Sequence, residues 1–209
     1  MKTDVPIVFV VDDDFRVREA LSSLISSAGF QVAVFASAAE FLESEKPDAP
    51  ACLVLDLQLP GTSGHELQQQ LADGDAPPII FISGHGDISS SVSAMKGGAV
   101  EFLSKPFGDE DLLRAIEAAI AIDRSAREKR SELAELQRHY QLLTHREREV
   151  LPFVVAGFAN KVTAANLGTS EITIGVHRGQ IMRKMGAKSL AELVRMADKL
   201  GVSRIPKSG

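Results

Sequence analysis

Hydrophobic and polar residues alternate in blocks along the first 123 residues of the chain. Segments with apolar residues at helical spacing, such as Leu21, Leu24 and Ile25, predict helices. Turn residues such as Pro60–Gly61 and Gly97–Gly98 separate the blocks. Between the helices, runs rich in Val, Ile, Leu and Phe predict five strands, at Val5–Val11, Gln31–Phe35, Ala51–Leu55, Ile79–Ile82 and Glu101–Leu103. This alternation predicts an α/β flavodoxin-like fold, with a five-stranded parallel sheet in the order 2-1-3-4-5.

The second half of the chain has a helical pattern and no strand pattern. Apolar positions near residues 112–120 predict the last helix of the first domain, which then runs into a strongly charged stretch. Leu133, Leu136, Tyr140 and Leu143 follow without proline or glycine, but two heptads are too few to claim a coiled coil. We therefore predict three parts: a first domain over 1–123, a long linker helix over 124–143, and an all-α domain of four helices over 144–209.

Capping residues divide the last 66 residues into those four helices. Thr144 with Glu147, and Ser189 with Glu192, have the spacing of capping boxes that start the first and last helices. Two further polar residues are expected to cap the second and third helices, Asn160 and Ser170. Glycines stand where helices are expected to stop, at Gly157, Gly168 and Gly186. Four short helices of this kind predict a helix-turn-helix unit.

The net charge of −5 over 209 residues conceals two opposite halves. Residues 1–123 contain 7 Lys and Arg against 20 Asp and Glu, whereas residues 124–209 contain 16 against 8. An acidic half joined to a basic half indicates a cation-binding or regulatory module joined to a nucleic-acid-binding module. Chance unevenness between solvated surfaces remains the ordinary alternative.

Cysteine content and hydropathy limit the cellular setting. Cys52 is the only cysteine, which excludes an intramolecular disulfide and a thiolate zinc cluster. The apolar runs are too short to span a membrane, and the first is followed by three aspartates rather than a cleavage site for a signal peptide. We therefore expect a cytoplasmic protein with no membrane partner.

Polar residues occupy the ends of the predicted strands. The first strand ends at Asp12, Asp13 and Asp14, and the third ends at Asp56. Because the carboxyl ends of parallel strands share one edge of the sheet, these carboxylates would repel each other unless a cation holds them. Oxygen ligands of this kind suit Mg²⁺ (or Mn²⁺), while Asp14 fits a helix N-cap better than a ligand. Two further residues at strand ends suit a phosphoryl oxygen, Ser83 and Lys105.

Four strings in the first domain, VFVVDDD, LVLDLQLPGTSG, IIFISGHGD and EFLSKPF, resemble the receiver domain of bacterial two-component response regulators. The resemblance covers residues 1–123. It implies that Asp56 is the phosphoacceptor, and that the metal is bound by Asp12, Asp13, Asp56 and the backbone carbonyl of Gln58. It further implies a switch hydroxyl at Ser83, a switch aromatic residue at Phe102, a phosphate-contacting Lys105, and a cis peptide bond before Pro106. Gln58 and His85, each two residues past a site residue, are expected to flank the attacking water and tune dephosphorylation.

The basic half contains the strings LTHREREVLPFVVAGFANK and SEITIGVHRGQIMRKM, which resemble the LuxR/NarL-type DNA-binding domain. Together with a receiver, they resemble the FixJ branch of response regulators. In that family a polar residue is usual where Gly175 stands, and Gly179 also removes a side chain. This departure left open whether the backbone approaches DNA closely there or the protein reads fewer bases directly.

A helical wheel of the third predicted helix separates a buried stripe from a DNA-facing side. At 100° per residue, Ile174, Ile181 and Met185 lie within about 40° of each other and are expected to be buried. On the opposite side, Arg183 is expected to contact guanine or phosphate, Gln180 adenine, and Val176 a thymine methyl group. Phosphate contacts are expected from Asn160, Lys161, Thr173, Lys184 and Lys188.

These observations predict a DNA-binding transcriptional regulator that a partner histidine kinase phosphorylates at Asp56. Phosphorylation would promote homodimerisation and binding to double-stranded promoter DNA, with RNA polymerase as a further partner. One alternative is a phosphorylation-independent DNA-binding protein whose receiver is only a dimerisation scaffold, which the complete set of site residues disfavours. The other is a turnover phosphatase, which would carry a second Asp where Gln58 stands. We therefore expect no enzyme activity beyond the receiver's own phosphotransfer and autodephosphorylation.

Overall fold

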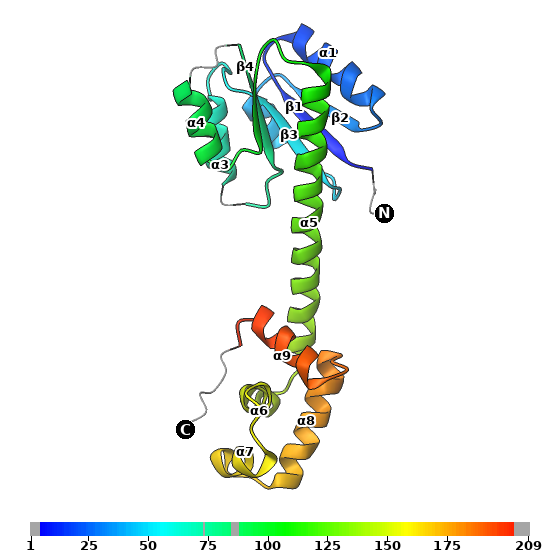
Figure 1. Ribbon diagram of the computed structural model, residues 1–209, viewed down its shortest axis with the longest axis vertical. Coiled ribbons are helices and arrows are strands. Elements are labelled where there is room, and N and C mark those ends of the chain that lie inside the picture. Colours follow the sequence, from blue (N-terminus) through cyan, green and yellow to red (C-terminus); the bar gives the residue numbers. More distant parts are fainter. Residues whose placement is uncertain (1–4, 73, 85–87, 203–209) are drawn as a thin grey trace. The chain divides into compact units, whose positions relative to one another are not determined.

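The computed structural model describes residues 5–72, 74–84 and 88–202, and the chain divides into two compact units, Met1–Arg127 and Glu128–Gly209. The first unit contains a five-stranded, fully parallel sheet in the order β2-β1-β3-β4-β5, as the sequence predicted (Figure 1). The strands are β1 (Ile7–Val11), β2 (Gln31–Phe35), β3 (Ala51–Asp56), β4 (Ile79–Ser83) and β5 (Glu101–Ser104). β1 begins two residues later than predicted. β3 and β4 each extend to include the polar residue at their carboxyl end.

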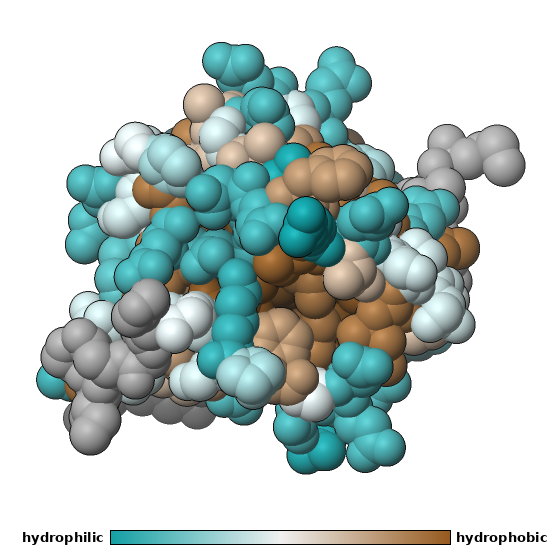
Figure 2. Space-filling view, turned by 90° about the horizontal axis from the view of Figure 1, so that it is seen from above, coloured by the Kyte–Doolittle hydropathy of each residue, from teal (hydrophilic) through white to brown (hydrophobic). Residues whose placement is uncertain are grey.

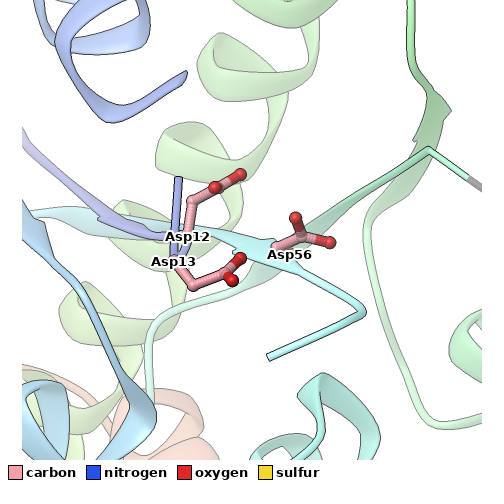
Figure 3. A group of neighbouring side chains, drawn as sticks. All are labelled: Asp12, Asp13 and Asp56. Carbon is pink, nitrogen blue, oxygen red and sulfur yellow. The ribbon is translucent and has the colours of Figure 1, made fainter. Parts of the chain in front are cut away.

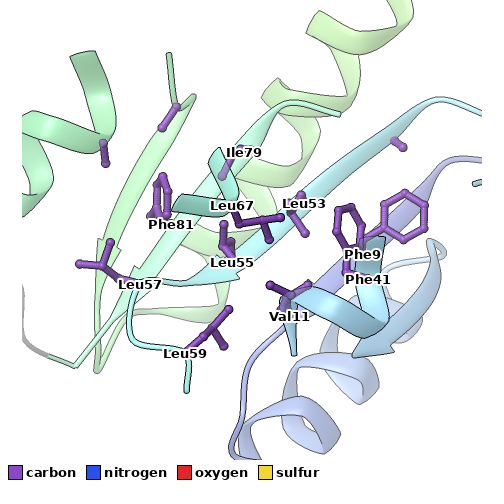
Figure 4. Packing of buried hydrophobic residues seen from close by; sticks show 14 of the residues in the cluster. Phe9, Val11, Phe41, Leu53, Leu55, Leu57, Leu59, Leu67, Ile79 and Phe81 are labelled. Carbon is purple, nitrogen blue, oxygen red and sulfur yellow. The ribbon is translucent and has the colours of Figure 1, made fainter. Parts of the chain in front are cut away.

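Successive residues of the central strands point to opposite faces of the sheet and fill two separate cores. On one face, side chains such as Phe9, Leu55 and Phe81 pack against α2 (Ala38–Glu43), α3 (Gly64–Leu71) and α4 (Ile88–Lys96) (Figure 4). On the other face, Val10, Val54 and Ile82 pack against α1 (Phe15–Ser27) and the first part of α5 (Asp109–Gln141). Because both faces are covered, β1, β3 and β4 are apolar at nearly every position.

Short polar segments between strands and helices set the directions of α1 and α3. The carboxylate of Asp14 accepts a hydrogen bond from the N–H of Arg16 at 2.8 Å and caps α1, as predicted. α3 begins with a capping box that we did not predict, in which Ser63 and Glu66 each bond the other's backbone N–H. Both caps lie next to the carboxyl ends of strands.

The helix α5 is 33 residues long and contributes to both units. Its first part packs Leu112 and Ile116 into the core of the first unit. Its last turn and the residues after it place Tyr140 and Leu143 against the core of the second unit. The apolar stripe that was considered as a short coiled coil therefore belongs in part to the second unit's own core. Over the ranges that the structure describes, no helix combines the length and apolar character needed to cross a membrane.

The second unit contains the four predicted helices. They are α6 (His145–Val155), α7 (Asn160–Leu167), α8 (Glu171–Met185) and α9 (Leu190–Lys199). The predicted stripe of α8 is fully buried, at Ile174, Ile181 and Met185. It packs among apolar residues of α6 and α9, including Val150 and Leu193.

The ends of these helices confirm most of the predicted caps. Thr144 and Glu147 form the predicted capping box, and Ser170 caps α8. The expected cap at Asn160 is wrong, because Ala159 is the N-cap residue and Asn160 is already the first residue of α7. The box predicted at Ser189 forms only in part, because Glu192 accepts from the N–H of Lys188 instead. Helices α7 and α8 end as predicted at Gly168 and Gly186, whose φ angles of 62° and 71° favour glycine.

Candidate functional site

Three aspartates form an acidic cluster at the carboxyl edge of the sheet, consisting of Asp12, Asp13 and Asp56 (Figure 3). Asp12 and Asp13 follow β1, and Asp56 is the last residue of β3. One carboxylate oxygen from each lies within 4.8 Å of the others. Asp12 and Asp56 are buried, whereas Asp13 is exposed. The cluster was predicted because strands β1 and β3 are neighbours and end at the same edge.

Lys105, which follows β5, bridges the two buried carboxylates. Its Nζ donates to Asp12 Oδ2 and to Asp56 Oδ2, each at 2.8 Å. The backbone N–H of Lys105 bonds Ser83 O at 2.7 Å, which ties the lysine to the end of β4. The peptide bond between Lys105 and Pro106 is cis, as the resemblance implied. One ammonium group is therefore bonded to two of the three carboxylates, and the cluster keeps an excess of formal negative charge.

Burial and hydrogen bonds act in opposite directions on these groups. Burial raises the pKa of Asp12, although hydrogen bonds from Lys105 and from the N–H of Asp14 oppose the rise. Burial lowers the pKa of Lys105, but the bonds to Asp12 and Asp56 outweigh it and raise that pKa above its usual value. Lys105 is therefore a fixed positive charge at neutral pH.

Backbone contacts hold the remaining oxygens of the cluster. Asp12 Oδ1 accepts the N–H of Asp14 at 2.9 Å, and Asp56 Oδ1 accepts the N–H of Gln58 at 3.0 Å. Arg18 on α1 donates to the carbonyl oxygen of Asp12 at 2.7 Å, a contact that the sequence analysis missed. Its only signal in the sequence is its place one helical turn after Asp14. These bonds orient the two buried carboxylates, Asp12 and Asp56.

Gly64, the first residue of α3, also positions Asp56. A Cβ atom at Gly64 would lie 2.6 Å from Asp56 O and 3.0 Å from Cα of Leu57. The N–H of Gly64 bonds Leu57 O at 3.1 Å. Only glycine permits this close approach, which the sequence pattern did not predict.

The donor set fits a divalent cation. Three carboxylates with hard oxygen donors and one exposed member leave an open side for water or phosphate oxygens, which Mg²⁺ retains when it binds proteins. Figure 2, which looks down on the carboxyl edge of the strands, shows hydrophilic residues around a central hydrophobic area. Asp56 is 7% exposed, so its carboxylate lies just below the surface.

The other predicted receiver residues lie on neighbouring strands. Ser83 is buried at the end of β4 and is paired in register with Ser104. Phe102 is half-buried on β5, with its ring centroid 6.5 Å from that of Phe81. Gln58 is exposed next to Asp56. His85 lies outside the described residues, so its predicted role is not tested by the geometry.

In the second unit, the predicted DNA-contacting residues of α8 differ in how strongly the protein itself holds them. Val176 is 57% exposed, whereas Lys184 Nζ donates to the buried carboxylate of Glu147 at 2.7 Å. Gln180 Oε1 accepts a hydrogen bond from Arg183, and the Thr173 hydroxyl lies 2.8 Å from Ser170 Oγ. Three further residues proposed for phosphate contacts lie near the surface, the exposed Lys161 and Lys188 and the partly exposed Asn160.

The helical wheel left out one residue of the same side. Ile172 is 81% exposed, the highest value among the large hydrophobic side chains that the structure describes. It precedes Val176 by one helical turn, and this spacing was visible in the sequence.

Comparison with known proteins identifies both units. Residues 8–117 match the response regulator receiver domain family, and residues 141–197 match the family described as bacterial regulatory proteins, luxR family. Nodulation protein W of Bradyrhizobium diazoefficiens is 50% identical over 94% of this chain and 87% of its own. The transcriptional regulatory protein FixJ of Azorhizobium caulinodans is 45% identical over 94% of this chain and 93% of its own. The solved structure of the response regulator StyR is 48% identical in sequence, with a TM-score of 0.84 over 93% of this chain and 99% of that one.

The chain is a two-component response regulator of the FixJ/NarL family. Proteins of this family are transcriptional regulators rather than catalytic enzymes, with a sensor kinase as partner of the receiver and DNA as partner of the LuxR-type domain. Receiver domains bind Mg²⁺ through acidic residues, and the acidic cluster of this response regulator is such a group.

Proposed function

We propose that a sensor histidine kinase phosphorylates this response regulator at Asp56, and that phosphorylation promotes dimerisation and binding to promoter DNA. The observation that carries the proposal is the bridge from Lys105 to both Asp12 and Asp56 beside the exposed Asp13. This arrangement places a nucleophilic carboxylate, a fixed cation and an open acidic site within one small volume. Residues with purely structural roles would not need that combination.

The chemistry follows from the positions of these groups. An oxygen of Asp56 attacks the phosphorus atom, the bond to the donor breaks, and the phosphoryl group is held as an acyl phosphate. Lys105 is positioned to move its ammonium group from carboxylate to phosphoryl oxygens and to offset their charge. Asp12, Asp13, Asp56 and the backbone carbonyl of Gln58 would hold Mg²⁺, which supplies further neutralisation of the transferring group.

The phosphoryl group also provides a way to change a distant surface. The Ser83 hydroxyl is proposed to move toward the phosphate, with Phe102 following into the space beside Phe81. This shift would remodel the surface of α4 and β5, on which two receivers would pair. Two paired LuxR-type domains would then bind half-sites about 10 bp apart, or a multiple of it, because major-groove faces recur once per turn. Pairing raises avidity through effective concentration without new base contacts.

Intact-mass measurement tests the phosphoacceptor. Incubation of the full-length protein with acetyl phosphate and Mg²⁺ is expected to add one labile phosphoryl group, and chelation with EDTA is expected to prevent it. Asp56→Asn should gain no mass. Asp14→Asn is the matched control, because Asp14 caps α1 from outside the cluster and asparagine also caps helices. Equal labelling of Asp56→Asn would refute the assignment.

Sedimentation and DNA mobility-shift titrations test the switch. The phosphorylated protein is expected to be dimeric and to bind promoter DNA more tightly than the untreated protein. The fragment from about Thr144 onward should bind weakly and with steep salt dependence. Equal mass and equal affinity in both states would instead favour a receiver that is only a dimerisation scaffold.

A further inference from the structure

The outer face of α8 consists of Ile172, Gly175, Val176, Gly179 and Arg183. At 100° per residue, Ile172, Val176, Gly179 and Arg183 lie within about 60° of each other, opposite the buried stripe of the same helix. Ile172 is 81% exposed and Val176 is 57% exposed. Arg183 carries the single formal charge of this set. The face is therefore apolar over the first two turns of the helix and charged only near its end.

Packing within the protein does not explain this composition. The core of the second unit is filled by residues on the opposite side of α8. A Cβ atom at Gly175 would approach the Asn160 side chain no closer than 3.6 Å, and one at Gly179 would meet nothing within 4 Å. Larger side chains would therefore fit at both glycines. The two glycines lower the surface around Val176 and let another molecule approach the backbone there.

We infer that Ile172 and Val176 form an apolar pair that reads the methyl groups of thymines in the major groove. The inference rests on the proposed DNA binding and names the base feature that this surface recognises. The thymine C5-methyl is the apolar group on the base edges of the major groove, and apolar side chains contact it there. In helix-turn-helix proteins, residues near the N-terminus of the recognition helix contact base edges. Ile172 is the second residue of α8.

The spacing of the two residues defines the pattern. Four helical residues advance about 6 Å along the helix axis. Base pairs rise about 3.4 Å per step, so the two methyl groups would lie within about two steps of each other. DNA is favoured over a protein as the occupant because residues 124–209 contain 16 basic against 8 acidic residues. The apolar pair thus supplies sequence preference, while the surrounding basic residues supply affinity.

Replacement of thymine by deoxyuridine tests the inference, because deoxyuridine pairs identically but lacks the methyl group. Duplexes would be enriched from a random pool by the phosphorylated full-length protein, and each thymine of a half-site would be replaced in turn. At two positions we expect the Kd to rise about fourfold, which corresponds to the free energy of burying one methyl group. Ile172→Ala should bind the thymine duplex about tenfold more weakly and lose the response at one of these positions. Val176→Ala should lose it at the other.

Leu190→Ala is the matched control, because Leu190 is an exposed apolar residue at the start of α9 in the same unit. It should keep both responses to deoxyuridine. The inference is wrong if Ile172→Ala keeps both responses, if it weakens thymine and deoxyuridine duplexes equally, or if the wild type ignores every replacement. Failure of the phosphorylation switch is a separate outcome, seen when untreated and phosphorylated protein bind one duplex equally. A wild type that enriches no duplex would overturn both.

Discussion

The acidic cluster and the outer face of α8 hold their functional side chains in opposite ways. Lys105 donates to both Asp12 and Asp56, and both carboxylates also accept backbone N–H groups. Ile172 and Val176 project from α8 with most of their surface exposed. The first group is ordered by the protein before a ligand arrives. The positions of the Ile172 and Val176 side chains would be fixed only by the molecule that binds them.

The difference follows from what each surface recognises. Phosphoryl transfer is accelerated by charges that are already in place when negative charge develops, so reorganisation must be small. A DNA-reading face must reach base edges inside a groove, and side chains committed to the protein interior cannot do so. Lys184 lies between these two cases. Its position on α8 predicts a phosphate contact, but its ion pair with Glu147 holds its side chain within the protein.

The largest expected effect comes from removing the bridge of the acidic cluster. Lys105→Met leaves three carboxylates without their ammonium partner and removes the charge that would stabilise the transferring group. We expect phosphorylation by acetyl phosphate to slow about a hundredfold. Lys46→Met is the control, because Lys46 precedes the amino end of β3, whereas the site lies at its carboxyl end, and Lys46 contacts Ser44 and the Phe41 ring. Phosphorylation of Lys105→Met at the wild-type rate would show that the bridge is only structural.

A second test disturbs the same site through the backbone alone. Gly64→Ala forces a methyl group against Asp56 O and Leu57, which have no room to move because β3 is buried. We expect a loss of about 1–3 kcal/mol in the free energy of unfolding of the receiver, the usual cost of overpacking. Urea unfolding measures it. Gly74→Ala is the control, since its nearest atom would be 4.0 Å away; an equal loss there would contradict the steric explanation.

A third test asks whether the second unit also depends on a fixed charge pair. Glu147→Gln keeps an oxygen for the Thr144 N–H but loses the charge that faces Lys184. We expect the free energy of unfolding of the unit to fall by about 1.5–3 kcal/mol, the usual value of a hydrogen bond to a charged group. Glu149→Gln, at a more exposed carboxylate of the same helix, is the control and should change stability less. Equal stability of the Glu147 variant and the wild type would show that the ion pair does not stabilise the fold, which would leave DNA contact as the role of Lys184.

The same pair predicts a pH dependence. Burial raises the pKa of Glu147, but the bonds from Lys184 and Thr144 outweigh it and hold that pKa below its ordinary value of 4.5. Because the folded state favours the charged form, the contribution is fully present above pH 4.5 and is lost as the pH falls through the lowered pKa. The difference in unfolding free energy between wild type and Glu147→Gln should therefore stay constant from pH 7 down to about pH 5 and should shrink as the pH falls below 4.5.

The smallest effect is expected where the acidic cluster meets solvent. Gln58 is exposed beside Asp56, and we expect it to flank the path of the attacking water together with His85. Gln58→Ala and His85→Ala should each change the rate of autodephosphorylation by only about a few-fold, well below the roughly hundredfold or more that a general acid or base contributes, because these side chains only flank the attacking water. Decay of the phosphorylated mass over time measures it. An unchanged rate in both variants would show that neither side chain controls water access.

The sequence alone predicted the parts of this protein that depend on local pattern. The strands, their order and most helix caps follow from apolar periodicity and from polar residues at helix starts. The cluster of Asp12, Asp13 and Asp56 was also predictable, because parallel strands must end at one edge. The predicted N-cap at Asn160 was wrong by one residue. Ala159 and Asn160 are adjacent in sequence, and only their backbone angles decide which of them precedes the helix as its N-cap.

Tertiary structure decided what depends on distances between segments far apart in the chain. The bridge from Lys105 requires β5 to lie beside β4, and the need for glycine at position 64 appears only when α3 approaches β3. The ion pair of Lys184 with Glu147 joins residues 37 apart. The extent of exposure also depends on packing: Ile172 and Ile174 lie two positions apart on opposite sides of α8, and the surrounding helices bury Ile174 completely while Ile172 stays 81% exposed. Periodicity describes one helix, whereas burial is a property of all the elements that surround it.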